Sequence, residues 1–311
     1  MPHFADRLVD RARHYASRVI VGLDPDLDHF PLILKRELGK SPQPGALEET
    51  LYQYLVTIID ATRDIAVAYK PQAAFFECFG LEGMSALQRT LEHLRQNECL
   101  IILDGKRNDV AHTARAYANA WLAAKRPLFG TPNPWRSDAM TVNGYLGSDG
   151  IRPFLDADPD AGLFVLAKTS NPSSGELQDL TLAGSGETVC HRMAGLVTQW
   201  GANWRGVSGY SRVGMVVGAT YPETAAQLRR LAPQALFLMP GIGPQAGSVA
   251  AIRAGAGADG LGAYAAVSRN ILYPCTPEEL DRPDWRNRLT RAASEAARGM
   301  KELIRSTLGH D

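Results

Sequence analysis

Short apolar runs alternate along the chain with longer stretches in which apolar residues recur at helical spacing. Eight such runs predict strands, and the stretches between them, such as "LEETLYQYLVTIIDATRDI" and "TARAYANAWLAA", predict helices. Strands that are apolar throughout and alternate with helices are typical of a parallel sheet covered by helices. The predicted strands span residues 19–24, 66–70, 100–104, 139–143, 163–168, 213–218, 236–240 and 258–264.

This repetition predicts an α/β fold of the closed (β/α)8 TIM barrel type. The alternative is an open doubly wound sheet with a small second domain, but no GxGxxG follows the first strand, which ends "VGLDPD". An extra N-terminal helix near residues 4–16 precedes the first strand, and "PEELDRPDWRNRLTRAASEAARGMKELIRSTL" predicts a last helix that closes the ring. The chain has no internal repeats, so we expect one barrel domain over residues 1–311.

Charge and cysteine content exclude several classes of protein. Lys and Arg number 33, as do Asp and Glu, which argues against a nucleic-acid or membrane-surface partner. The charged N-terminus lacks the apolar core of a signal peptide, and no later stretch is long enough to span a bilayer. The four cysteines form no CxxC and the histidines show no metal-ligand spacing, so we expect reduced thiols, no zinc site and a cytoplasmic location.

Charged and hydrogen-bonding residues gather where the predicted strands end. The stretch "LIILDGKRNDV", residues 100–110, begins as a buried strand and ends in four charges. In a TIM barrel the reacting groups lie at the C-terminal ends of strands, so these ends are the candidate active site. They carry Asp24, Lys70, Asp104 with Lys106, Lys168 with Ser170, residues 241–245, and Ser268 with Arg269.

The alternation of side chains along a strand puts Asp104 and Lys106 on the same side, which we expect to face the barrel axis. Asp109 follows where the next helix should begin, and Lys70 ends the neighbouring strand. The plainer interpretation is a surface ion pair with Asp109 as a helix cap. If two lysines and two aspartates converge instead, each lysine keeps its proton and is a proton donor rather than an amine nucleophile.

A phosphate site is predicted on the other side of the barrel mouth. The Gly-rich segment "MPGIGPQAG", residues 239–247, connects the seventh strand to its helix, and its N–H groups with Gln245 can hold an anion. Arg269 lies just past the eighth strand. Phosphate sites after strands seven and eight are common in these barrels.

Together these segments resemble one family, the orotidine 5'-phosphate decarboxylases in their longer prokaryotic form. The matching segments are "VGLDPD", "YKPQAAFFECFG", "LDGKRNDVAHTARAYA", "LAKTSNPSSGELQD", "PGIGPQAG" and "SRNILY", in family order from the first strand to the eighth. The resemblance implies a lyase that converts orotidine 5'-phosphate to uridine 5'-phosphate in de novo pyrimidine synthesis. It also implies a homodimer with shared active sites and neither metal nor organic cofactor.

The resemblance further implies roles for individual residues. Lys106 corresponds to the proton donor to C6, Asp104 to the carboxylate beside the substrate carboxylate, and Lys70 to the lysine that completes the charged network. Asp109 corresponds to the aspartate that enters the partner subunit's site. The substrate-binding residues implied are Asp24 and Thr113 for the ribose, Ser170 for the pyrimidine, and Gln245 and Arg269 for the phosphate.

Some positions depart from the family pattern. Gly105, Asn108 and Val110 stand where the third strand of the family usually has Ala, Gly and Ile. Pro244 and Ala246 stiffen the Gly-rich loop, so we expect a difference in its closure and in turnover. Rival functions are a magnesium-dependent sugar-phosphate decarboxylase or aldolase, a Schiff-base aldolase using Lys70 or Lys168, and a non-catalytic nucleotide-binding protein.

Overall fold

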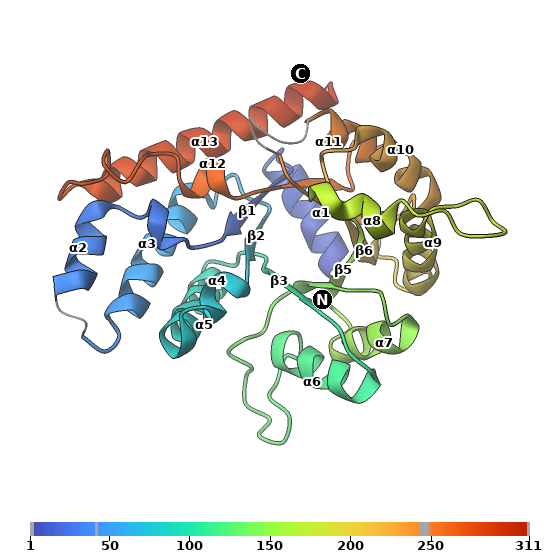
Figure 1. Cartoon of the computed structure of the whole chain (residues 1–311), viewed down its shortest axis with the longest axis horizontal. Helices are drawn as coiled ribbons and strands as arrows, with labels where there is room; N and C mark the ends of the chain where they lie inside the picture. The colour runs from blue at the N-terminus through green and yellow to red at the C-terminus, as the bar shows by residue number, and fades with distance from the viewer. Residues whose placement is uncertain (1–2, 41–42, 243–248, 310–311) are drawn as a thin grey trace.

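Eight parallel strands alternate with helices around a barrel in the computed structural model, which describes residues 3–40, 43–242 and 249–309 (Figure 1). Hydrogen-bonded neighbours follow the order β2-β1-β8-β7-β6-β5-β4-β3. Isolated parallel bridges from Tyr69 to Ile101 and from Gln72 to Asp104 join β2 to β3 and complete the ring. The predicted (β/α)8 TIM barrel with an extra N-terminal helix is confirmed.

The strands fall close to seven of the eight predicted positions. They are β1 (Val19–Leu23), β2 (Ala68–Pro71), β3 (Ile102–Arg107), β4 (Ala139–Val142), β5 (Gly162–Lys168), β6 (Ser211–Val217), β7 (Ala235–Pro240) and β8 (Ala263–Val267). The helices are α1 (Phe4–His14), α2 (Leu32–Lys40), α3 (Ala46–Thr62), α4 (Ala74–Glu77), α5 (Gly80–Gln96), α6 (Ala111–Trp121), α7 (Ser148–Ala157), α8 (Gly175–Gln178), α9 (Val189–Gly201), α10 (Pro222–Leu231), α11 (Ala250–Gly255), α12 (Arg269–Leu272) and α13 (Trp285–Leu308).

The eighth strand was predicted wrongly over residues 258–264, because most of that segment is a turn. Gly257 accepts a hydrogen bond from the N–H of Gly260 at 3.0 Å, and its own N–H donates to Leu261 O at 2.7 Å. Gly260 and Gly262 have φ of +70° and +82°, which lie in the left-handed region that favours glycine. The chain therefore becomes extended only at Ala263.

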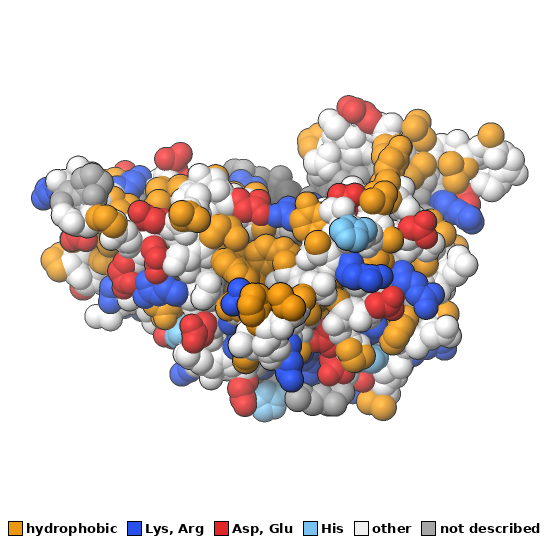
Figure 2. Space-filling model, turned by 90° about the horizontal axis from the view of Figure 1, so that it is seen from below, with side chains coloured by type: hydrophobic (Ala, Val, Ile, Leu, Met, Phe, Trp, Pro, Cys, Tyr) orange, Lys and Arg blue, Asp and Glu red, His pale blue; other side chains and the backbone are white. Residues whose placement is uncertain are grey.

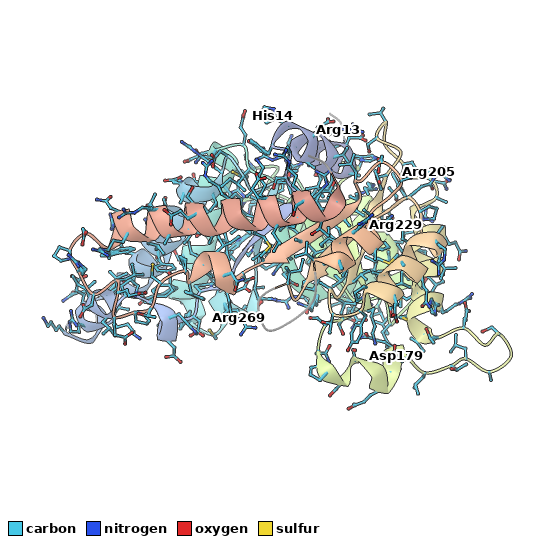
Figure 3. All side chains as sticks on the ribbon, turned by 90° about the horizontal axis from the view of Figure 1, so that it is seen from above. Arg13, His14, Asp179, Arg205, Arg229 and Arg269 are labelled. Carbon is cyan, nitrogen blue, oxygen red and sulfur yellow. The ribbon has the colours of Figure 1, made fainter. Side chains whose placement is uncertain are left out.

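Helix α1 closes the N-terminal end of the barrel. Its apolar face, with Phe4, Leu8 and Val9, belongs to the same buried cluster as the inward-facing side chains of the strands. Phe4 meets Phe164 of β5 edge to face, with ring centroids 5.8 Å apart. In Figure 3 the end of α1, with Arg13, lies on the opposite side of the molecule from Arg269. The barrel is thus plugged at one end, which leaves the other for a site.

A second buried cluster fills the layer between the strands and the outer helices, and α13 lies across it against α3 and α12. Acidic and basic side chains are interspersed on the face shown in Figure 2, in keeping with a net charge of zero. Within the described ranges, no helix combines the length and the hydropathy needed to cross a membrane.

The plug predicts a large contribution of Phe4 to stability. Phe4 is fully buried, and a Cβ added at Gly162 would come within 2.2 Å of its ring, so the ring fills its site closely. Phe4→Ala should lower the free energy of unfolding by about 3–5 kcal/mol. Urea denaturation measures this, with Val207→Ala, at a side chain 96% exposed, as a control expected within about 0.5 kcal/mol of wild type. If the two substitutions lowered the free energy of unfolding equally, the proposed packing of Phe4 in the end of the barrel would be wrong.

Candidate active site

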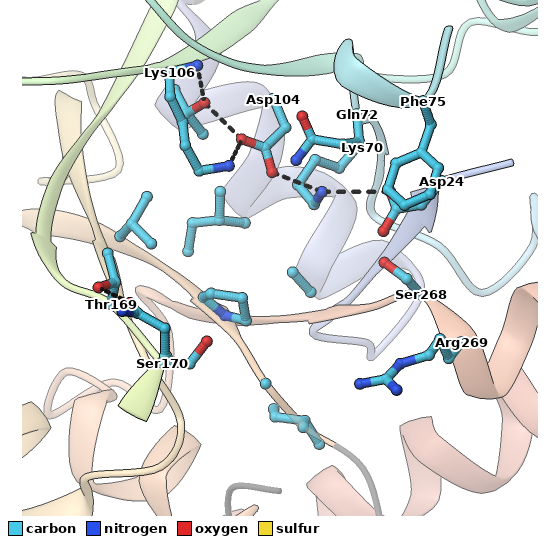
Figure 4. A pocket seen from close by; sticks show the side chains of 18 of the residues that line it. Asp24, Lys70, Gln72, Phe75, Asp104, Lys106, Thr169, Ser170, Ser268 and Arg269 are labelled. Atoms are coloured by element: carbon cyan, nitrogen blue, oxygen red, sulfur yellow. Dashed lines mark hydrogen bonds and ion pairs between the residues drawn. The ribbon is translucent and has the colours of Figure 1, made fainter. Parts of the chain in front are cut away.

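A cavity of about 840 Å³ opens at the C-terminal ends of the strands. Figure 4 shows Lys106, Asp104 and Lys70 in a row on one side of it, with Ser170 and Arg269 across from them. Its lining includes the predicted site residues Asp24, Lys70, Asp104, Lys106, Ser170 and Arg269, together with Gln72, Phe75, Thr141, Ser268 and Tyr273.

Four charged side chains alternate in sign along this wall. Asp104 accepts hydrogen bonds from Lys106 Nζ at 2.6 Å and from Lys70 Nζ at 2.9 Å, through different carboxylate oxygens. Lys70 Nζ also lies 3.7 Å from Asp24 Oδ1. The run Asp24–Lys70–Asp104–Lys106 therefore crosses from the end of β1 through β2 to β3. Strands β1 and β2 pair directly in the sheet, whereas β2 and β3 are neighbours only because the sheet closes into a barrel.

Asp104 and Lys106 meet through an irregular strand rather than through simple alternation. The register between β3 and β4 shifts between Leu103 and Arg107, and Lys106 has φ of +47°, a costly value for a residue with a Cβ. Thr141 of β4 stabilises this shape, because its hydroxyl accepts from Lys106 N at 3.0 Å and donates to Asp104 Oδ1 at 2.8 Å. Sequence analysis did not single out Thr141, although a hydroxyl in an otherwise apolar predicted strand was a usable signal.

The ion pairs decide the charge states of the buried groups. Burial alone raises the pKa of Asp104, but the ammonium groups of Lys70 and Lys106 outweigh it and hold the pKa of this carboxyl well below its usual range. Burial lowers the pKa of Lys70, and Asp24 and Asp104 more than offset that effect, so the pKa of Lys70 lies above its ordinary value. Asp104 is therefore ionised and Lys70 protonated at neutral pH.

Asp109 and Thr113 do not line the cavity of their own chain. Asp109 is half-buried, and its carboxylate accepts from the N–H of Val110 at 2.7 Å. The N-cap of α6 is Val110, without a side-chain cap, so the interpretation of Asp109 as the helix cap is wrong. Thr113, in the first turn of α6, is also half-buried. Lys70, Asp104 and Lys106 thus converge without Asp109.

The predicted phosphate and pyrimidine residues are only partly within the described structure. Ser170 lies close against two glycines, since a Cβ added at Gly218 or Gly241 would come within 2.9 Å and 3.1 Å of its atoms. Arg269 begins α12 and is exposed at the cavity. Gln245, with Pro244 and Ala246, lies outside the described residues.

The lysines considered for Schiff-base chemistry are both engaged with carboxylates. Lys168 Nζ donates to both oxygens of Asp179, at 2.7 and 2.8 Å, and lies 4.6 Å from the ring centroid of Tyr221. Lys70 is held by Asp104, as described above. Among residues 3–40, 43–242 and 249–309, no three His, Cys, Asp or Glu side chains are grouped so that they could hold a metal ion.

Comparison with known proteins gives one consistent family. The profile of the "Orotidine 5'-phosphate decarboxylase / HUMPS family" matches residues 17–279. An orotidine 5'-phosphate decarboxylase of Rhodopirellula baltica is 38% identical over 307 residues, 97% of this chain and 100% of the relative. One of Haloarcula marismortui is 37% identical over 303 residues, 97% and 98% of the two chains. The solved structure of Leishmania donovani OMP decarboxylase matches with a TM-score of 0.73 and 32% identity, covering 99% of each chain.

The depressed pKa of Asp104 predicts a pH-dependent effect of Asp104→Asn on stability. Loss of the carboxylate leaves two ammonium groups without their shared partner, so the free energy of unfolding at pH 7 should fall by about 3 kcal/mol. A depressed carboxyl pKa stabilises the fold above the pKa of the unfolded chain, and this is lost as pH falls through the folded pKa. The difference between wild type and variant should therefore shrink on acidification below about pH 4. Urea denaturation from pH 7 to pH 3 measures it, and a difference that grows on acidification would contradict the charge assignment.

Proposed function

The chain belongs to the orotidine 5'-phosphate decarboxylase / HUMPS family, and we propose that it decarboxylates orotidine 5'-phosphate to uridine 5'-phosphate without metal or organic cofactor. The observation that carries this proposal is the alternating run of ammonium and carboxylate groups on one wall of the cavity. Such a run suits a reaction in which negative charge develops at a carbon that has no electron sink.

In the proposed mechanism the bond between C6 and the carboxylate carbon breaks, and the electron pair stays on C6. CO2 leaves, and Lys106 transfers a proton from its ammonium group to C6. Lys106 is then reprotonated from solvent. Asp104 fixes the ammonium group of Lys106 at one end and is itself fixed by Lys70 at the other. The positive charge thus stands in place before the carbanion forms, which is the source of electrostatic stabilisation.

Substrate binding is assigned to the remaining lining residues. Asp24 Oδ1 is buried without a hydrogen-bond donor in the described structure, so it can accept from a ribose hydroxyl. Ser170 contacts the pyrimidine, and Arg269, with Gln245 of the Gly-rich segment, holds the phosphate. Binding energy from the phosphate, remote from the reacting carbon, positions C6 against Lys106.

We further propose that a second copy of the chain completes each site. Asp109 does not line its own cavity, and the segments beside it expose apolar side chains. The apolar side chains exposed there are Val110, Tyr145 and Leu146, at 62%, 78% and 47%, and a partner that covered them would bury apolar surface. In the proposed homodimer these side chains are covered, while Asp109 and Thr113 of one chain enter the site of the other.

The proposed mechanism predicts that Lys106→Ala removes decarboxylation. Loss of a general acid costs about 10²–10⁴-fold, and loss of a charge from this network should reach the upper end of that range. The assay is the loss of orotidine 5'-phosphate absorbance with purified protein, with and without EDTA. Wild-type activity should be unchanged by EDTA, and circular dichroism should show that the variant is folded. A variant that keeps a tenth of the wild-type kcat excludes the role of Lys106, and activity lost with EDTA indicates a metal-dependent reaction.

A shared site predicts that two inactive variants restore activity together. Asp109→Ala and Lys106→Ala should each be inactive as homodimers. After subunit exchange, one site of each mixed dimer has Lys106 from one chain and Asp109 from the other. Random exchange of equal amounts should therefore give about a quarter of wild-type activity. If the mixture stays inactive although exchange is shown with labelled subunits, Asp109 does not act in the partner's site.

A further inference from the structure

The segment that carries Asp109 is tied to two neighbouring parts of the barrel. Arg107 donates to Gly105 O at 2.9 Å and pairs with Glu77 of α4. Asn108 donates through its amide nitrogen to the carbonyl of Asn143, just past β4. The end of β3 is thus fastened to α4 on one side and to the β4–α7 connection on the other.

Asn108 also fixes the residue that follows it. Its Oδ1 accepts a hydrogen bond from the N–H of Asp109 at 2.8 Å. One amide group therefore joins the backbone of Asp109 to the backbone of Asn143, and both of its ends are used. Glycine or alanine at this position can make neither bond.

Helix α7 leaves a fitted space for this amide. A Cβ added at Gly150, in the first turn of α7, would come within 2.1 Å of Asn108 Oδ1 and 3.0 Å of Nδ2. The amide of Asn108 therefore packs directly on the backbone of α7. An amide that is packed and bonded at both ends cannot rotate freely, so the backbone of Asp109 keeps one orientation.

We propose that Asn108 is a positioning residue that holds Asp109 ready to enter the site of a second copy of this chain. This inference rests on the proposed role of Asp109 in the partner's site. Asp109 does not line the cavity of its own chain, and its carboxylate bonds only the adjacent N–H of Val110 among the described contacts, so a fixed orientation of this segment suits a group outside that cavity. Because the backbone of Asp109 is already held, no conformational entropy is lost in ordering this segment when the carboxylate enters the partner's site.

The test uses the full-length chain and the orotidine 5'-phosphate assay. Asn108→Ala should lower kcat about ten- to a hundred-fold, because a small misplacement of a catalytic group costs on that scale. Asn143→Ala is the matched control: it removes a side-chain amide from the same connection but keeps the carbonyl to which Asn108 donates. Its kcat should stay within about two-fold of wild type, because the bond that this amide accepts from the N–H of Tyr145 lies in an exposed turn and its loss leaves the bonds of Asn108 intact.

Subunit exchange distinguishes positioning of Asp109 from a general defect. When Asn108→Ala is mixed with Lys106→Ala, one site of each mixed dimer has Lys106 from the first chain and a correctly held Asp109 from the second. Activity should rise to about a quarter of wild type. A structural defect in the Asn108→Ala chain would also impair that site, because the site contains that chain's own Lys106.

Gly150→Ala provides a second route should Asn108→Ala fold poorly. It keeps Asn108 but displaces its amide, and the same recovery with Lys106→Ala is expected. The proposal is overturned if Asn108→Ala has near wild-type kcat. It is also overturned if neither variant recovers activity with Lys106→Ala while Asp109→Ala does. If Asp109→Ala also fails to recover, the shared site itself is wrong.

Discussion

The carboxylate of Asp104, shared by the ammonium groups of Lys70 and Lys106, is the interaction on which this site depends. The buried charges of Asp104 and Lys70 would each be costly without a partner, and their ion pair keeps both groups ionised in the cavity wall. The arrangement requires β2 and β3 to be adjacent. The parallel bridge from Gln72 to Asp104, at the closure of the barrel, supplies that adjacency. The charge network therefore forms only when the barrel is closed between β2 and β3.

The same network accounts for the irregular end of β3. A lysine with φ of +47° is unfavourable by about 1–3 kcal/mol. It persists because Thr141 binds both the backbone of Lys106 and the carboxylate of Asp104. The strain turns the strand so that Lys106 reaches back to Asp104 while the chain continues outward to Asp109. One short segment thus serves the cavity of its own chain and, in the proposed dimer, the cavity of the partner.

Much of this architecture could be predicted from the sequence, because eight apolar runs separated by helical patterns leave few alternatives to a parallel barrel. The eighth strand was misplaced, since "ADGLGAY" is apolar enough for a strand but its glycines adopt a turn. Alternation along a regular strand put Asp104 and Lys106 on one side, and the side chains do meet. They meet through a register shift that no local pattern reveals. The hydroxyl of Thr141 in an apolar strand marks a residue worth considering, but its partners could not be predicted, because they arise from the pairing of β3 with β4.

The structure explains one departure from the family pattern, the asparagine at position 108. A glycine at position 108 would leave the backbone of Asp109 free to sample many orientations, whereas the amide of Asn108 ties it to Asn143. That tie is possible only because Gly150 leaves room for the amide, so positions 108 and 150 must be considered together. In the sequence, asparagine in place of glycine at position 108 suggests only a less flexible backbone. In the folded chain, the side chain of Asn108 forms hydrogen bonds that connect the ends of β3 and β4. The positioning of Asp109 therefore depends on a pair of residues distant in sequence, one contributing an amide and the other the absence of a side chain.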